Sequence, residues 1–239
     1  MKGAAELAAP FSMGGKWQPW CSVLQNRREW GTLDGMGRTD RFFSFFITSF
    51  FIAFFLVTAT ARVQAQAGPE EDGNEVQVWA GGGHSVPGGT SQTEAFDAGL
   101  RYGWVITGAH LPGLLRGRFE YAVDAVPVYL IFQPANTAYG LGFNPLGLKW
   151  NFERRGRFSP YLELGGGVLY TNHNVPTYTN TVNFTPSAAF GTHILGEKYN
   201  WSLELRYLHI SNAGLATPNP GINSVQVRLG IGKFFGRHD

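Results

Sequence analysis

Strict alternation of apolar and polar residues near the end of the chain constrains its fold more than any other feature. In residues 224–231 the odd positions are apolar, whereas the even positions are polar or glycine: Val225, Val227, Leu229 and Ile231 against Ser224, Gln226, Arg228 and Gly230. Successive side chains of a β-strand point to opposite faces, so this period of two predicts a strand with one apolar and one polar face.

Similar segments, rich in glycine and aromatic residues and separated by turn residues, recur through the chain. We predict eight strands, at about 75–84, 93–106, 116–132, 139–153, 158–171, 181–195, 199–212 and 223–235. No segment shows a convincing amphipathic helical pattern. Pro127 cannot donate a ladder hydrogen bond, so we expect a bulge or local edge there. Glycines 165–167 suit a tightly curved, narrow barrel wall.

The connections between these strands alternate in length. Those at 153–157 and 196–199 are short and charged, whereas those at 85–92, 172–181 and 212–222 are longer and polar or rich in Gly and Pro. Outer-membrane barrels have short periplasmic turns and long extracellular loops. The connection at 108–117 is long for a periplasmic turn and fits this pattern less well. With the amino terminus in the periplasm, the seventh strand runs outward.

The polar face decides between a membrane barrel and a soluble ligand-binding barrel. A soluble barrel that encloses a ligand needs an apolar interior. The face opposite the apolar stripes here carries Glu204, Arg206, Gln226 and Arg228. We therefore predict an all-β, eight-stranded antiparallel transmembrane β-barrel, with these polar residues inside and the apolar stripes toward lipid. Trp79, Trp104, Trp150 and Trp201 are interpreted as anchors at the membrane interface.

A run of 20 uncharged residues, 42–61, precedes the barrel segments and is flanked by Arg38, Arg41 and Arg62. Basic residues before it and an Ala-x-Ala sequence at 65–67 favour a secretory signal peptide, although an uncleaved anchor is the alternative. We expect translation to begin at Met36. This gives an upstream extension at 1–35, mis-assigned or disordered, a signal peptide at 36–67 and the barrel domain at 68–239.

Charge and cysteine content narrow the function further. The formal net charge of +2 argues against a nucleic-acid partner. The chain has one cysteine, Cys21, which lies before the expected signal peptide. The exported chain would therefore have no disulfide, and barrel closure in a membrane is one alternative source of stability.

A candidate catalytic pair lies on the seventh strand. His209 and Ser211 are two residues apart and so share one face of an extended strand. That face also carries the apolar residues Trp201, Leu203, Leu205 and Tyr207. The pair thus lies at the outer end of an apolar stripe, and a hydrolase so placed would act on a lipid. A His and a Ser at this spacing also occur by chance, so the pair alone is weak evidence.

The residues around this pair are more specific. The sequence HISNAG at 209–214, preceded by RY and followed by PNPG, resembles the active-site segment of the outer-membrane lipid A 3-O-deacylases, the PagL family. The resemblance implies an eight-stranded barrel that hydrolyses the 3-linked acyl ester of lipid A. It implies Ser211 as the nucleophile, His209 as the general base, and the Asn212 side chain with the Gly214 backbone N–H as oxyanion donors.

The third catalytic position departs from the family. The family usually has a Glu early in the last strand to orient the histidine, and this chain has Asn223 there. Asn223 has the same parity as Val225 and Val227, so we expect it to face lipid beside the His/Ser pair. Its amide could accept the imidazole N–H, as in Cys-His-Asn hydrolases, although a neutral partner stabilises an imidazolium less than a carboxylate does. Slower turnover or an inactive site is the expected consequence.

The remaining inferences concern partners and alternatives. The expected partner is lipid A, or lipopolysaccharide, in the outer leaflet of a Gram-negative-type outer membrane, and the resemblance implies no cofactor. The other histidines lack metal-ligand spacing, so no metal site is predicted: His84, His110, His173, His193 and His238. A non-catalytic barrel with a structural, adhesive or lipopolysaccharide-binding role is the main alternative. A narrow pore is a second, which an interior filled by side chains disfavours. The sequence specifies no oligomeric state.

Overall fold

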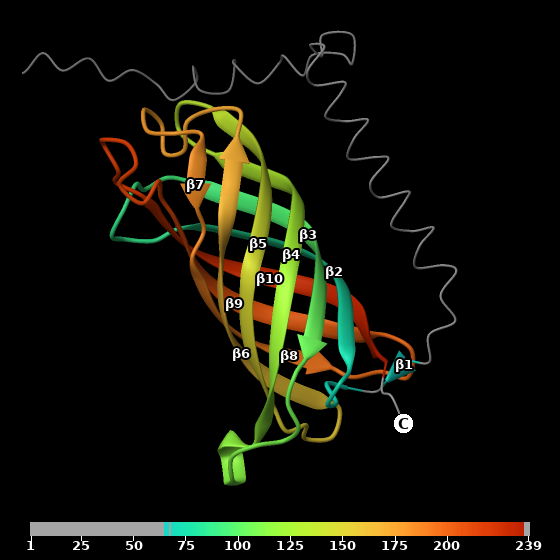
Figure 1. Ribbon diagram of the computed structural model, residues 1–239. Helices are drawn as coiled ribbons and strands as arrows, with labels where there is room; N and C mark the ends of the chain where they lie inside the picture. The colour runs from blue at the N-terminus through green and yellow to red at the C-terminus, as the bar shows by residue number, and fades with distance from the viewer. Residues whose placement is uncertain (1–64, 67, 237–239) are drawn as a thin grey trace, which may run out of the picture. The chain divides into compact units, whose positions relative to one another are not determined.

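A computed structural model describes residues 65–66 and 68–236 (Figure 1). The predicted upstream extension and nearly all of the predicted signal peptide, residues 1–64 and 67, lie outside the described residues. The exception is a two-residue strand, β1 (Ala65–Gln66), which pairs with the end of the last strand. Within the described residues, no helix is both long and apolar enough to cross a lipid bilayer.

The barrel is a closed antiparallel sheet in which each strand pairs with its sequence neighbour and the last pairs with the first. Its strands are β2 (Asn74–Ser85), β3 (Glu94–Val105), β4 (Gly117–Phe132), β5 (Thr137–Phe152), β6 (Phe158–Thr171), β7 (Val182–Phe184), β8 (Ser187–Ile194), β9 (Asn200–Ile210) and β10 (Ile222–Phe235). β7 and β8 together occupy one position between β6 and β9. The predicted eight-stranded barrel is confirmed.

The sixth predicted strand, 181–195, is interrupted where β7 ends and β8 begins. Pro186 lies in the interruption, and a proline has no N–H to donate to a neighbouring strand. The pairing register with β6 and β9 is nevertheless the same on both sides, because Thr185 N still donates to Gly167 O at 2.9 Å and His209 N donates to Pro186 O at 3.0 Å. The two short strands therefore act as one wall element.

The bulge expected at Pro127 is confirmed. The register between β4 and β5 shifts between Val126 and Tyr129, and the register between β3 and β4 shifts after Ala98. Both irregularities include Pro127, whose missing N–H cannot serve either ladder. An extra residue at this position increases the local bend and twist, which suits a narrow barrel.

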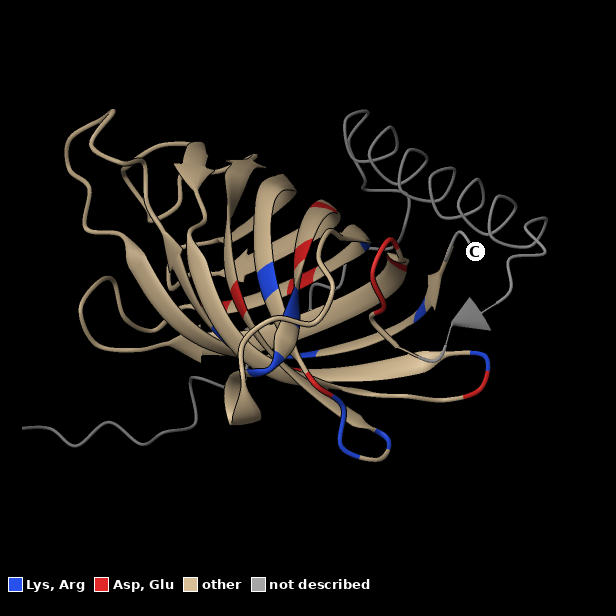
Figure 2. Cartoon of the chain, turned by 60° about the horizontal axis from the view of Figure 1, so that its bottom comes forward, with Lys and Arg blue, Asp and Glu red and all other residues tan. Residues whose placement is uncertain are grey.

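Side chains separate by parity into an apolar outer wall and a polar interior. Along β9 the odd positions, such as Trp201 and Leu205, are exposed, and the even positions Glu204 and Arg206 are buried. Arg206 Nε donates to Glu204 Oε1 at 3.0 Å inside the barrel. This arrangement matches the predicted lipid-facing wall and differs from that of a soluble barrel with an apolar interior. Figure 2 shows charged residues along the strands and in the turns at one barrel end.

The interior charges are paired across the barrel. Lys149 Nζ lies 2.5 Å from Glu75 Oε2 and 2.9 Å from Glu120 Oε1, while Arg101 Nη1 lies 2.6 Å from Glu163 Oε2. All five side chains are buried. Buried charges are tolerated only when they are paired and hydrogen-bonded, so these bridges hold opposite walls together and fill the lumen.

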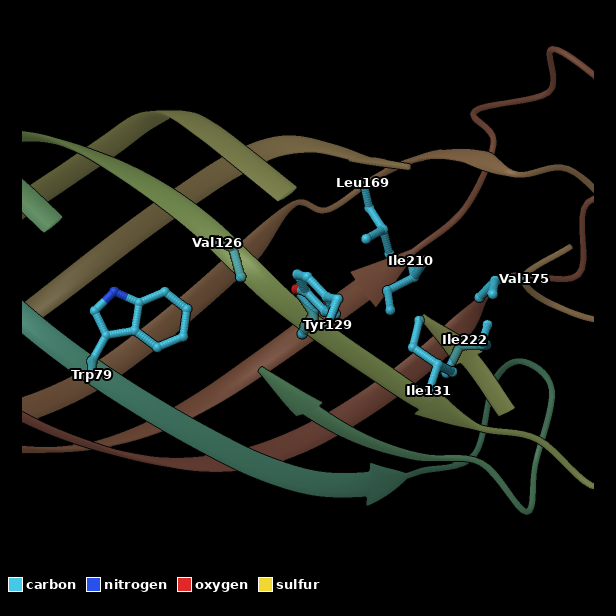
Figure 3. Close-up of a cluster of buried hydrophobic side chains, with 10 residues drawn as sticks. Trp79, Val126, Tyr129, Ile131, Leu169, Val175, Ile210 and Ile222 are labelled. Carbon is cyan, nitrogen blue, oxygen red and sulfur yellow. The ribbon is translucent and has the colours of Figure 1, made fainter. Parts of the chain in front are cut away.

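An apolar cluster fills the interior toward the end of the barrel where β9 ends and β10 begins (Figure 3). Its buried members are Trp79, Val126, Tyr129, Ile131, Ala138, Leu169, Val175, Leu208, Ile210 and Ile222. Trp79 is 1% exposed, and its ring lies 3.4 Å from the guanidinium carbon of Arg228. The interpretation of Trp79 as a membrane-interface anchor is therefore wrong, because the odd positions of β2 face inward. The cluster packs the lumen, which further disfavours a pore.

The two ends of the barrel differ in their connections. One end has the turns at 153–157 and 195–199 and a longer connection at 106–116 that includes the 3-10 helix η3 (Gly113–Leu115). The other end has the segments 86–93, 172–181 and 211–221, together with a four-residue connection at 133–136. The rule of short inner and long outer connections thus holds with two exceptions. We call the second end the loop end, and the first the turn end.

Candidate active site

The hairpin of β9 and β10 brings His209 and Asn223 together at the loop end. The two residues are direct cross-strand partners, and so are Tyr207 with Val225 and Leu205 with Val227 on the outward face. Directly opposed residues of an antiparallel pair project to the same face. His209 Nδ1 lies 2.6 Å from Asn223 Oδ1, which is a short hydrogen bond.

This hydrogen bond sets the tautomer of the neutral ring. The amide oxygen of Asn223 can only accept, so Nδ1 of His209 carries the proton and donates it. In a neutral imidazole the other nitrogen, Nε2, is then free to accept a proton. The arrangement therefore leaves the basic nitrogen of His209 available for a neighbouring hydroxyl.

Ser211 follows directly after β9 and is held by the short strand β7. Its backbone N donates to Phe184 O at 3.2 Å, and Phe184 N donates to Ser211 O at 2.7 Å. Ser211 and Phe184 form an antiparallel bridge, so their side chains project to the same, outward side. Ser211 is 8% exposed. Among the described residues, no hydrogen bond joins its hydroxyl to His209, a contact that in hydrolases often tightens only when substrate binds.

Asn212 organises the loop behind the serine. Its side-chain oxygen accepts the Gly214 N–H at 2.9 Å, and its Nδ2 donates to Ala216 O at 3.1 Å. Its own backbone N donates to Asn219 Oδ1 at 3.1 Å. The two expected oxyanion donors are therefore adjacent, but the Gly214 N–H is engaged and Asn212 Nδ2 retains one of its two hydrogens.

Two glycines that the sequence analysis did not select shape the space around His209 and Asn223. A Cβ added to Gly221, where φ is +66°, would lie 2.8 Å from His209 Cε1, and one added to Gly88, where φ is +107°, would lie 2.8 Å from Asn223 Nδ2. Both positions thus require glycine for backbone conformation and for space. Gly221 belongs to the PNPG turn sequence and Gly88 to a Gly-Gly pair. These two turn patterns are the only features of the sequence that mark the positions of the two glycines.

The β2–β3 loop holds the start of β10 in place. Val86 N donates to Asn223 O at 2.8 Å, and Thr90 N donates to Gly221 O at 2.9 Å. These bonds satisfy the backbone on both sides of Ile222 and fix the position of Asn223 relative to β9. The histidine partner is thus positioned from two directions, by β9 and by this loop.

Among residues 65–66 and 68–236, no three His, Cys, Asp or Glu side chains gather so that they could hold a metal ion. His193 is buried in the barrel near Lys149 and Glu75 and forms part of the interior network.

A comparison with models of known protein families shows to which family the chain belongs. The sequence model of the family described as "Lipid A 3-O-deacylase (PagL)" matches residues 94–232, more than half of the chain. The chain belongs to the PagL family. The matched region runs from β3 into β10 and includes all five predicted site residues, so the resemblance noted around 206–223 extends to most of the barrel.

Two solved structures are similar to this PagL-family chain. The outer membrane enzyme PagL matches with 23% sequence identity and a TM-score of 0.49, covering 64% of this chain and 97% of that one. Neisserial surface protein A (NspA) matches with 14% identity and a TM-score of 0.45, covering 67% of this chain and 96% of that one. Among curated protein sequences, none matches this chain.

Proposed function

We propose that this chain is an outer-membrane serine esterase that hydrolyses the 3-O-linked acyl chain of lipid A. Membership of the PagL family supports a lipid A deacylase in general. The observation that carries the finer proposal is the 2.6 Å hydrogen bond between His209 Nδ1 and Asn223 Oδ1 on the apolar outer wall, with Ser211 two residues further along. An oriented base beside a hydroxyl is the arrangement that nucleophilic catalysis requires.

In this mechanism Ser211 Oγ attacks the ester carbonyl while His209 Nε2 accepts its proton. The donors for the tetrahedral oxyanion would become available by a shift of the loop at 212–216, because the Asn212 side chain is buried and its Oδ1 accepts the Gly214 N–H. That shift would free the Gly214 N–H and expose the second amide hydrogen of Asn212. Collapse of this intermediate transfers the proton from His209 to the leaving sugar hydroxyl and leaves an acyl-enzyme. Water, activated by the same histidine, then releases the fatty acid.

Asn223 makes the reaction slower than a carboxylate partner would. A hydrogen bond to a charged group contributes more than one between neutral groups, so a neutral amide stabilises the imidazolium of the transition state less. Asn223 still holds the ring in the required tautomer through the bond at 2.6 Å. We therefore expect a working but weakened enzyme.

The position on the wall determines how substrate arrives. His209 lies at the end of the exposed apolar stripe formed by Trp201, Leu203, Leu205 and Tyr207. A lipid with its acyl chains along this stripe brings its ester level with the loop end, without entering the packed lumen. Lipid A in the outer leaflet would reach the site by lateral diffusion, with the turn end in the periplasm.

The test is mass spectrometry of lipid A from an outer-membrane-bearing host that expresses the chain, beside hosts that express Ser211→Ala and His209→Ala. Wild type should remove one hydroxyacyl mass, specifically from the 3-position, and both variants should remove none while keeping heat-modifiable barrel mobility. Unchanged lipid A in all three hosts, with the wild-type barrel shown to be folded in the outer membrane, would favour the non-catalytic barrel. Deacylation that persists in Ser211→Ala would refute the nucleophile.

A further inference from the structure

A groove of about 800 Å³ lies at the turn end of the barrel, away from His209 and Ser211. It lies between the β5–β6 turn, 153–157, and the β8–β9 turn, 195–199. Arg157 Nε donates to Leu195 O at 3.2 Å, and Leu195 N donates to Arg157 O at 2.7 Å. These two bonds join the turns, so the groove is formed by the folded barrel itself.

The groove carries an excess of positive charge. Arg154, Arg157 and Lys198 line it, against one acid, Glu197, and all four residues are exposed. In the described part of the chain the ion pairs at this end are Arg116–Glu153 and Arg118–Glu70, which use none of the three cations: Arg154, Arg157 and Lys198. The three charges are therefore available to an anion. Figure 2 shows basic and acidic residues together on the turns at this end of the barrel.

The groove adjoins the apolar outer wall of the barrel. Trp201, which is 56% exposed, lines the groove and begins the outward stripe that continues through Leu203 and Leu205 along β9. Tyr199 also lines the groove, and the centre of its ring lies 4.5 Å from Lys233 Nζ. Aromatic residues at a strand end mark the level at which a lipid headgroup meets the acyl chains. A cationic groove at that level, open onto an apolar wall, fits an amphiphile with an anionic head.

The loop end has the opposite character. Its connecting segments, 86–93, 133–136, 172–181 and 211–221, contain no Lys, Arg, Asp or Glu. Among the described connections, those with basic side chains therefore lie at the turn end, where such side chains can attract the anionic lipid heads of the adjacent leaflet.

We propose that this groove is a binding site for an anionic phospholipid of the leaflet at the turn end. The phosphate would contact Arg154, Arg157 and Lys198, and the acyl chains would lie along Trp201 and the β9 stripe. A lipid held there fixes the depth of the barrel in the membrane. The site is separate from the proposed esterase centre and binds without reaction.

Native mass spectrometry of the purified full chain in a neutral detergent tests this site. The protein is offered equal amounts of phosphatidylglycerol and phosphatidylcholine with identical acyl chains. Wild type should retain phosphatidylglycerol with a preference of about tenfold or more, since each basic side chain near a lipid surface contributes up to about fivefold. The variant Arg154→Gln/Arg157→Gln/Lys198→Gln should lose this preference.

Arg155→Gln is the matched control, because Arg155 is an exposed cation of the same turn that does not line the groove. It should bind phosphatidylglycerol like wild type. Equal retention of both lipids by wild type, or equal loss in the control and the triple variant, would overturn the proposal. Displacement of the lipid by millimolar inorganic phosphate would also contradict it, because the site would then recognise a free anion.

Folding of the variants is checked by heat-modifiable mobility, and Lys198→Gln alone replaces the triple variant if that one does not fold. This single variant should lower the preference by about fivefold, and a preference equal to that of wild type would count against the proposal. Ester hydrolysis in detergent should be unchanged in all of these variants, since the groove lies at the other end of the barrel from Ser211. Failure of the esterase proposal would thus leave the lipid-retention result intact.

Discussion

Replacement of Asn223 by Asp tests how the proposed base is oriented and charged. Asp has the same length and shape as Asn, so Asn223→Asp keeps an oxygen 2.6 Å from His209 Nδ1 and replaces the amide nitrogen by a second oxygen. The side chain of a Glu, by contrast, is one methylene longer and would change the geometry as well. The isosteric change alters only the charge of the histidine partner.

The expected gain follows from the energy of this one hydrogen bond. A neutral hydrogen bond contributes about 1 kcal/mol net, and one to a charged group about 1.5–3 kcal/mol. The carboxylate should therefore stabilise the developing imidazolium by about 1 kcal/mol more, which corresponds to roughly a fivefold rise in kcat. KM should stay the same, since the interaction strengthens only in the transition state. Burial of Asn223, which is 8% exposed, limits the gain because a carboxylate there loses hydration.

Purified wild type, Asn223→Asp and Asn223→Leu would be compared by the rate of fatty-acid release from lipid A in detergent. Leu has the same branching and number of side-chain heavy atoms but cannot accept a hydrogen bond, so the ring loses its orientation and kcat should fall at least about tenfold. If Asn223→Leu hydrolyses lipid A as fast as wild type, Asn223 does not orient the base. If Asn223→Asp is slower than wild type while the barrel is folded, the charge argument is wrong.

Three further substitutions test the surroundings of the site and the barrel. Gly221→Ala should lower kcat at least about tenfold without unfolding the barrel, because the new Cβ would lie 2.8 Å from His209 Cε1 and φ there is +66°; a rate equal to that of wild type would contradict this packing. Lys149→Met leaves two buried carboxylates without their cation and should destabilise the barrel by roughly 3–5 kcal/mol, measured by urea unfolding in detergent. Leu205→Arg places a charge on the lipid-facing wall and should cost about 2–4 kcal/mol in lipid vesicles. The same change at Leu215, in an exposed loop, is its control and should cost little.

The strand pattern was predictable because the two faces of each strand meet different surroundings. In β10, lipid-facing residues such as Val227 alternate with inward residues such as Arg228, and the period of two follows directly. The break between β7 and β8 has a local signal in Pro186, but the unbroken register on either side depends on both neighbouring strands. The inward orientation of Trp79 had a local signal in its shared parity with Glu75 and Gln77, whereas its partner Arg228 comes from the other end of the chain and had none.

The part of the candidate site that is formed by residues close in the sequence was predictable. His209 and Asn223 are joined by one hairpin, so parity along two strands sufficed to place them on the same face. The contribution of the β2–β3 loop was not predictable, since the bond from Val86 N to Asn223 O joins residues far apart in the sequence. The hydrogen bond from the Gly214 N–H to Asn212 Oδ1 was not predicted either, because the sequence does not show which acceptor a backbone N–H binds.

Covalent labelling of the serine tests the central claim most directly. The purified protein would be treated with a long-chain alkyl fluorophosphonate, which reacts with activated serines, and analysed by intact-mass and peptide mass spectrometry. We predict one adduct per chain, on the peptide that contains Ser211, and strongly reduced labelling in His209→Ala. Labelling at another residue, or an unlabelled Ser211 in a protein that still hydrolyses lipid A, would contradict the proposed nucleophile.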